Sequence, residues 1–355
     1  MLFKQNIIKK TELEAQEFPV LFFRNCYLVD GNDMGKRNTI ITYQMTGLCA
    51  LMHLLVDGIC VCCLYLMASH FSTSQTVEIF IVYNVLAFMS QPLTGMWADR
   101  LEQKHWMLLV SVLLLTLAVL ATSVVMFMRI FGMSVVAVLL GAGNSLFHVW
   151  GGKLVAVSTR NDIRDLGTFV ATGVFGLSLG AVFCSWHMLY IFLISLCLLS
   201  IMMLHIDKST STKGSSEVIK NRFGATFVLL SVTALMVVVM MRSFVSESFS
   251  GGLRKSSEMV LFIGMMSMLG KMAGGWIAHS IGIIRTIVMI LPLLVLCFLF
   301  RNQSMVALFV GMLAINCTMP ITLYLVNVIL PGREGLAFGL LAAALIPGYL
   351  FTFVL

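Results

Sequence analysis

Long, uninterrupted apolar runs recur along the chain after residue 40, and this repetition limits the possible folds more than any other feature. A window of about 19 residues separates eleven such runs. A helix rises 1.5 Å per residue, so runs of this length can cross the roughly 30 Å hydrocarbon core of a bilayer. The runs cover residues 41–67, 79–97, 106–128, 131–157, 166–184, 188–206, 225–249, 258–278, 283–300, 305–330 and 336–355. The sequence therefore predicts an all-α, polytopic membrane protein.

The composition excludes other classes of protein. Hydrophobic residues make up 59% of the 355 residues and charged residues only 11%, whereas a soluble domain carries about 25% charged residues. Too few charges are present to cover a water-facing surface, and too many apolar runs are present for a receptor with one span. The net charge of +7 is modest, so we expect neither a soluble enzyme nor a nucleic-acid-binding protein.

Two polar stretches divide the chain. Residues 1–40 mix acidic and basic side chains around one apolar patch that is too short for a span or a signal-peptide core. Residues 207–224 are rich in lysine, serine and threonine, which is typical of a linker. We therefore expect an N-terminal cytoplasmic tail at 1–40, a six-helix bundle at 41–206, a cytoplasmic linker at 207–224 and a five-span bundle at 225–355.

The distribution of lysine and arginine predicts the orientation of the spans. If the N-terminus is cytoplasmic, the inner segments of the first half and the linker hold fifteen of these cations, and the outer loops of that half hold only Arg129. Short cytoplasmic loops are rich in Lys and Arg, so the tail and the linker are expected on the cytoplasmic side. The second half follows this rule less well, because three of its loop cations would lie outside and two inside.

A short motif recurs half a chain later. The segment TGMWADR at 94–100 ends the second run, and GGWIAHS at 274–280 ends the eighth, 180 residues further on. Duplicated halves are typical of transporters that bind their substrate between the two repeats. The second copy has His279 where the first has Asp99, so we expect the second half to gate less strongly.

Four stretches together resemble a known family. The sequence GMWADRLEQK at 95–104 resembles the loop signature of the major facilitator superfamily. HLLVDG at 53–58, GAGNSLFH at 141–148 and LPGREGLAFG at 330–339 resemble the fosmidomycin-resistance exporters of that superfamily. The similarity covers about residues 41–355. It implies two six-helix halves, of which eleven spans are visible here and a twelfth is apparently absent, and antiport: efflux of small molecules in exchange for protons, as in drug resistance.

Asp57 and His53 are the candidate groups for proton coupling. They stand four residues apart in the first run, so a helix places them on one face, one turn apart. A carboxylate near the middle of a membrane is costly unless it is paired or hydrated, which makes it a functional candidate. Histidine titrates near neutrality, so the pair is suited to carrying a proton. The alternative is a structural polar pair that links two helices.

Two cations in the second half are candidate substrate-binding residues. Arg242 lies in the seventh run at about the depth of Asp57 in the first, where it could face Asp57, and Lys271 lies in the eighth run. Two deep cations outnumber one deep carboxylate, so a central site would be net positive and would attract an anionic substrate. In the alternative interpretation, each long side chain extends to the aqueous interface.

The remaining candidates lie in the fourth run and in the first loop motif. His148 precedes a glycine pair, and Asn144 belongs to the stretch that carries the resemblance. Both are candidate substrate-binding residues, and a buried hydrogen bond between helices is the alternative role for His148. Gly95, Asp99 and Arg100 end the second run. Because a carboxylate there can cap the N-terminus of a facing helix, we expect these three residues to gate the cytoplasmic side.

We expect no cofactor, no resident metal and no covalent chemistry. The 26 methionines and most of the nine cysteines lie in apolar runs and are expected to pack as hydrophobic side chains. Uptake of a small metabolite, or of copper through soft sulfur ligands, is the alternative with the same fold. An intramembrane enzyme and a transport-dead sensor are alternatives of another class. The expected partners are a small, amphipathic or anionic substrate, protons and the lipid bilayer, for a monomer in the bacterial inner membrane if the source is bacterial.

Overall fold

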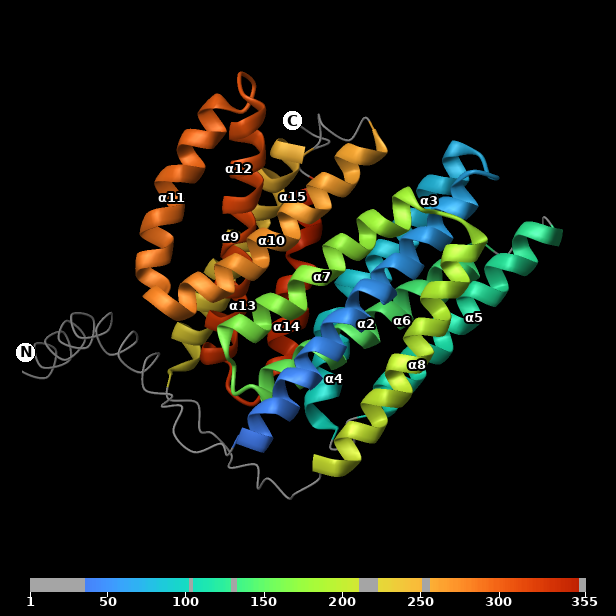
Figure 1. Cartoon of the computed structure of the whole chain (residues 1–355), viewed down its shortest axis with the longest axis horizontal. Helices are drawn as coiled ribbons and strands as arrows, with labels where there is room; N and C mark the ends of the chain where they lie inside the picture. Colours follow the sequence, from blue (N-terminus) through green and yellow to red (C-terminus); the bar gives the residue numbers. More distant parts are fainter. Residues whose placement is uncertain (1–35, 102–104, 129–132, 211–222, 251–255, 351–355) are drawn as a thin grey trace, which may run out of the picture. The chain divides into compact units, whose positions relative to one another are not determined.

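The computed structural model describes residues 36–101, 105–128, 133–210, 223–250 and 256–350 (Figure 1). The chain divides into two units, Met1–Ile41 and Thr42–Leu355. All described helices lie in the second unit, apart from the first residues of α2. The expected tail up to residue 35 and most of the expected linker, residues 211–222, fall outside the described residues.

The first half of the second unit contains seven described α-helices. They are α2 (Lys36–Ala68), α3 (Thr73–Asn84), α4 (Gln91–Arg100), α5 (Trp106–Met128), α6 (Met133–Ser158), α7 (Ile163–Val182) and α8 (Trp186–Thr210). A π-helical turn, η1 (Val85–Met89), joins α3 to α4, so that these three elements form one span. Such turns often occur near functional sites, and η1 packs against α6.

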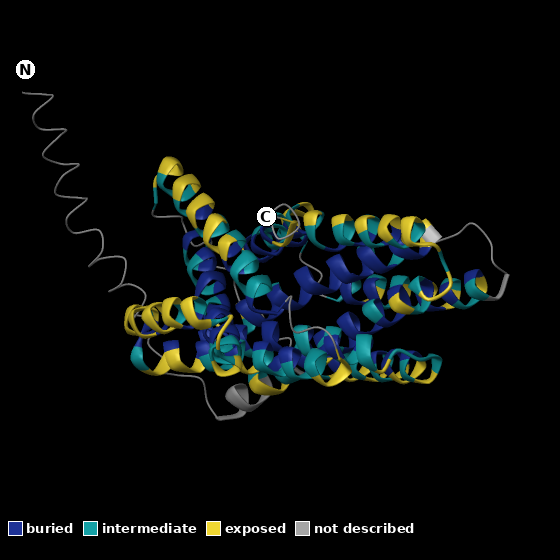
Figure 2. Cartoon of the chain, turned by 90° about the horizontal axis from the view of Figure 1, so that it is seen from above, coloured by how far each residue is buried: buried dark blue, intermediate teal, exposed yellow. Residues whose placement is uncertain are grey.

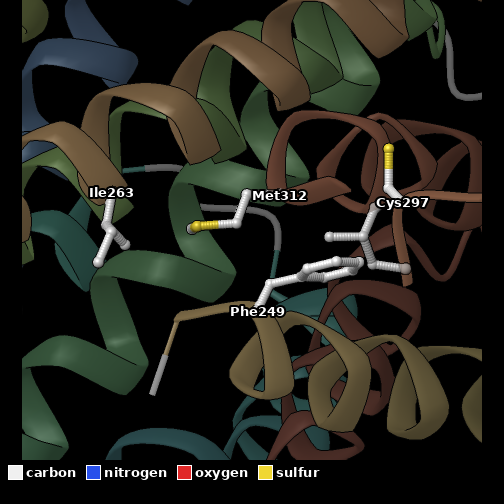
Figure 3. Close-up of a cluster of buried hydrophobic side chains, with 5 residues drawn as sticks. Phe249, Ile263, Cys297 and Met312 are labelled. Carbon is white, nitrogen blue, oxygen red and sulfur yellow. The ribbon is translucent and has the colours of Figure 1, made fainter. Parts of the chain in front are cut away.

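The second half contains seven described helices that are shorter on average. They are α9 (Ala225–Ser250), α10 (Ser257–Ile281), α11 (Ile283–Phe300), α12 (Met305–Asn316), α13 (Thr318–Ile329), α14 (Glu334–Ala343) and α15 (Leu345–Leu350). α12 and α13 together form one span, Met305–Ile329. Figure 3 shows part of the apolar core of this half, where Phe249 of α9, Ile263 of α10, Cys297 of α11 and Met312 of α12 gather with Ile315.

The helical prediction is confirmed. Ten helices in the described part are long and apolar enough to cross a membrane, and α14 and α15 form a shorter apolar helix at Glu334–Leu350. No strand occurs among the described residues. Every apolar run of the sequence thus coincides with a helix, because a chain in lipid must satisfy its backbone hydrogen bonds within each segment.

Large apolar side chains cover the outer faces of the helices. Leu93, Leu229 and Val306 are 67%, 67% and 69% exposed, and Figure 2 shows exposed residues along the outside of the helices, with buried residues between them. A water-soluble protein does not leave this much contiguous apolar surface exposed. These faces are suited to contact with lipid.

The two halves contact each other mainly through two pairs of helices, α7 with α10 and α4 with α14. Glycines permit both contacts. A Cβ atom on Gly95 of α4 would overlap the backbone of Gly335, and one on Gly275 of α10 would lie 2.6 Å from the carbonyl oxygen of Ile163. Small residues allow helix backbones in membranes to approach closely, so the duplicated motif supplies a close approach between the halves at both places.

Candidate functional site

Four buried polar side chains from two helices meet in the first half. α2 contributes His53 and Asp57, and α6 contributes Asn144 and His148. Asp57 lies 3.4 Å from Nε2 of His53 and 3.5 Å from Nε2 of His148, and its Oδ1 accepts a hydrogen bond of 3.0 Å from Nδ2 of Asn144. All four are at most 6% exposed. The expected pairing of His53 with Asp57 is therefore present, and His148 and Asn144 join the same cluster.

The hydrogen-bond partners define where the imidazole protons lie. Nδ1 of His53 is 2.7 Å from the carbonyl oxygen of Phe169, and Nδ1 of His148 is 2.9 Å from the carbonyl oxygen of Asn144. A carbonyl only accepts, so both Nδ1 atoms carry hydrogen. In two neutral rings both Nε2 atoms would then be bare, yet they lie only 2.7 Å apart. One proton shared between the two Nε2 atoms removes the repulsion of their lone pairs.

The same donor atoms also form the one group of three metal-ligating side chains found among the described residues, His53, Asp57 and His148, with ligand atoms within 4.8 Å of one another. Tetrahedral zinc with bonds of 2.0–2.1 Å holds two ligands roughly 3.3 Å apart. The two distances from Asp57 fit this value, but the 2.7 Å between the imidazoles is too short. The spacing fits a shared proton better than a metal, and no thiol belongs to the group.

α7 and α14 shape the space around the cluster. The ring of His53 stacks on Phe169 of α7 with centroids 4.7 Å apart. A Cβ atom on Gly173 of α7 would overlap Nε2 of His53 and lie 2.5 Å from Oδ2 of Asp57. Phe338 of α14 packs against Phe169 at 5.9 Å and against His148 at 6.4 Å. The cluster therefore touches the second half through Phe338.

Arg242 and Lys271 come from α9 and α10 in the second half. Arg242 is only 6% exposed, so it does not extend to the interface. Its Nε and Nη2 atoms are buried and have no hydrogen-bond partner in the described part of the chain. The expected direct contact of Arg242 with Asp57 is not formed by these atoms, because Asp57 is held by the two histidines and Asn144. Lys271 interacts electrostatically with both Arg242 and Asp57.

Asp99 joins the two halves at the end that is expected to be cytoplasmic. Its Oδ1 accepts a hydrogen bond from the N–H of Gly335 at 2.9 Å, and its Oδ2 accepts one from Leu336 at 2.8 Å. These N–H groups belong to the first turn of α14, where the helix dipole favours a negative charge. Lys153 lies 3.6 Å from Asp99 and donates to the carbonyl oxygen of Ala98 at 2.7 Å.

The other two residues of the expected gate differ in their surroundings. Gly95 lies against Gly335, where a larger residue would push α4 and α14 apart. Arg100 is exposed. Of the three residues expected to gate, Gly95 and Asp99 contact α14 of the second half.

The second copy of the motif makes a related contact between the halves. Asp162 caps the N-terminus of α7 by accepting a hydrogen bond of 2.9 Å from the backbone N–H of Arg164, and it also binds the Arg164 guanidinium at 2.6 Å. His279 of α10 places Nδ1 3.5 Å from Asp162. Burial raises the pKa of Asp162, but the hydrogen bonds from Arg164 outweigh burial and leave the pKa below its usual value. At this second contact the capping carboxylate, Asp162, belongs to α7. At the first contact it is Asp99, which belongs to α4, the helix that carries the motif.

Sequence reasoning did not identify Phe169, Phe338, Lys153 or Asp162 as part of these sites. Phe169 acts through its backbone carbonyl, which leaves no sequence signal. Asp162 does have one, because an Asp directly before a helix is a typical N-cap. Gly173 was visible only as one of several small residues in its run.

Comparisons with known proteins agree with this architecture. The family model described as "Major Facilitator Superfamily" matches residues 46–351. The E. coli fucose:proton symporter FucP has a similar structure, with a TM-score of 0.64, 14% identity, and coverage of 88% of this chain and 90% of that chain. A bacterial homologue of the iron transporter ferroportin in the outward-facing state gives a TM-score of 0.55, 15% identity and coverage of 87% and 91%. At these identities the likeness concerns the fold alone. No curated protein sequence matches the chain.

Proposed function

Since this chain belongs to the Major Facilitator Superfamily, we propose that it couples secondary transport of a small amphipathic or anionic molecule to the movement of protons. Membership makes it a multi-pass membrane transporter and not an enzyme. The observation that carries the proposal is the distance of 2.7 Å between the Nε2 atoms of His53 and His148. A proton between these atoms is the coupling proton.

The charges of the cluster support this role. With the shared proton the two imidazoles carry one positive charge, which Asp57 balances from 3.4 and 3.5 Å. Without the proton the cluster has a net charge of −1. A buried net charge is costly in a membrane, so the loaded and empty states differ strongly in electrostatic energy. Such a difference allows proton binding to drive a conformational change.

Alternating access requires a gate that opens and closes, and Asp99 is suited to this. Its two hydrogen bonds to Gly335 and Leu336 hold α14 against α4. We propose that these bonds break when the cytoplasmic side opens. The resemblance to the fosmidomycin-resistance exporters favours export. The response of transport to an imposed pH gradient reports the direction in which the compound moves.

The experiment uses the purified protein in liposomes with a pH gradient as the only driving force. A panel of phosphonates, sugars and antibiotics identifies a transported compound, and the variants Asp57→Asn and His148→Gln are then compared with wild type. Both variants should lose accumulation against a gradient, because Asp57→Asn removes the charge that balances the shared proton and His148→Gln removes one of the two atoms that share it. Exchange of labelled for unlabelled compound at equal pH should persist, since it needs no net proton movement.

His70→Gln is the matched control. His70 lies just beyond α2 and is exposed, so its replacement should leave coupling unchanged. Accumulation by Asp57→Asn as strong as that of wild type would refute the proposal.

A further inference from the structure

Arg242 has two buried donors without a partner. The side chain is 6% exposed, and neither Nε nor Nη2 finds an acceptor within the described residues. A guanidinium stays protonated in proteins, so α9 carries an uncompensated positive charge into a membrane span. A buried charge of this kind normally has a partner. The partner must therefore come from outside the described residues or from another conformation.

The two free donors determine what kind of partner fits. Nε–H and Nη2–H lie on the same edge of the planar guanidinium and point in parallel directions. This edge matches two oxygen atoms of a carboxylate, phosphoryl or sulfonyl group in a bidentate contact. A neutral hydroxyl or a cation offers no such pair of acceptors. We infer that Arg242 binds the oxyanion group of the transported molecule, which specifies the substrate class for the proposed function and rests on it.

Lys271 connects this binding edge to the proton cluster. Its charge interacts with Arg242 and with Asp57, so Lys271 acts on both the binding edge and the cluster. Cys60 and Tyr83 are further titratable groups that act on Asp57, and neither becomes a cation. When the cluster holds its proton, it is neutral and leaves the cations uncompensated. When it loses the proton, its net negative charge competes with the oxyanion for these cations.

Proton binding and oxyanion binding therefore strengthen each other. By linkage, if the proton raises the affinity for the anion, the anion raises the affinity for the proton by the same factor. A carrier that binds both together moves both in the same direction, whereas exchange requires that they compete. These charges thus favour cotransport of an oxyanion with a proton, and this differs from the exchange that the resemblance to exporters implies.

The test measures binding of benzenesulfonate to the whole protein in lipid nanodiscs at pH 6 and pH 8. Benzenesulfonate stays ionised over this range, so any proton taken up on binding is taken up by the protein and not by the ligand. Wild type should bind it about tenfold more tightly at pH 6, within the usual range of coupling between sites, and should take up protons from a weakly buffered solution on binding. Neutral benzyl alcohol, which offers a single oxygen, should show no such pH dependence.

Variants of Arg242 distinguish the contribution of its bidentate hydrogen bonds from that of its charge. Arg242→Gln should weaken benzenesulfonate binding by about tenfold or more and leave benzyl alcohol binding unaffected. Arg242→Lys keeps the charge but loses the bidentate edge, and should recover only part of the affinity. Arg285→Gln is the matched control, because Arg285 is exposed on α11 and its loss should change nothing.

Three outcomes would overturn the inference. If benzenesulfonate, sulfate and inorganic phosphate all fail to bind at millimolar concentrations, Arg242 is not an oxyanion site. If binding releases protons or is tighter at pH 8, the sites compete and cotransport is wrong. If a pH gradient drives only cationic compounds and Asp57→Asn abolishes this, the proposed function stands while the inference fails.

Discussion

Asp99 and Gly335 are 236 residues apart in the chain, yet the Asp99 carboxylate accepts a hydrogen bond of 2.9 Å from the Gly335 backbone N–H. The contact joins the end of α4 in the first half to the start of α14 in the second. A carboxylate at a helix N-terminus is stabilised by the free N–H groups and the helix dipole. A single side chain therefore stabilises one arrangement of the two halves.

Asp99→Asn should shift the protein toward states in which the cytoplasmic side is open. The amide keeps the size of the side chain but removes the charge, which is worth about 0.3–1 kcal/mol at a helix N-terminus and up to about 2 kcal/mol when partly buried. The equilibrium between conformations should move severalfold. Labelling of single cysteines placed on the inner and outer sides measures this shift. Arg100→Gln is the control because Arg100 is exposed, and equal labelling of Asp99→Asn and wild type would contradict the gating role.

Gly173→Ala should disrupt the proton cluster. The added methyl group would overlap Nε2 of His53 and crowd Oδ2 of Asp57. Overpacking of this kind costs about 1–3 kcal/mol, and the imidazole pair should separate to make room. We expect proton-driven transport to fall sharply while the protein still folds.

Gly47→Ala provides the control for Gly173→Ala. Gly47 lies in α2, and no atom lies within 4 Å of the position where its Cβ would be built. Thermal stability and proton-driven accumulation are measured for both variants. If Gly173→Ala transports as well as Gly47→Ala, the close fit around His53 is not required for coupling.

Asp162→Ala should lower the free energy of unfolding by about 1 kcal/mol, the typical contribution of an N-cap. The pKa of Asp162 is lowered in the folded protein by its bonds to Arg164. Because the pKa of Asp162 is lower in the folded than in the unfolded protein, its contribution to stability is fully present above the unfolded pKa of about 3.9. This contribution is lost as the pH falls from there through the folded pKa. The difference in the free energy of unfolding between variant and wild type should therefore be the same at pH 7 and pH 5. A difference that already shrinks as the pH falls from 7 to 5 would show that the pKa of Asp162 is not lowered in the folded protein.

The apolar runs made the helices and the duplicated halves predictable, because each span must satisfy its own backbone and face lipid. The spacing of His53 and Asp57 predicted their contact, since helix geometry alone brings positions i and i+4 together. The contact of His53 with His148 was not predictable, because it depends on how α2 and α6 pack. The role of Phe169 was not predictable either, since any residue has a carbonyl group. Arg242 is buried within its helix, but its expected partner Asp57 is already held by other side chains.

Nuclear magnetic resonance of the protein with 15N-labelled histidine in lipid can detect the proton shared between His53 and His148. We expect a scalar coupling between the two Nε2 nuclei across the shared hydrogen, and its disappearance in His148→Gln but not in His70→Gln. Two histidines that both carry hydrogen on Nδ1 and show no such coupling at any pH between 5 and 8 would rule out the shared proton.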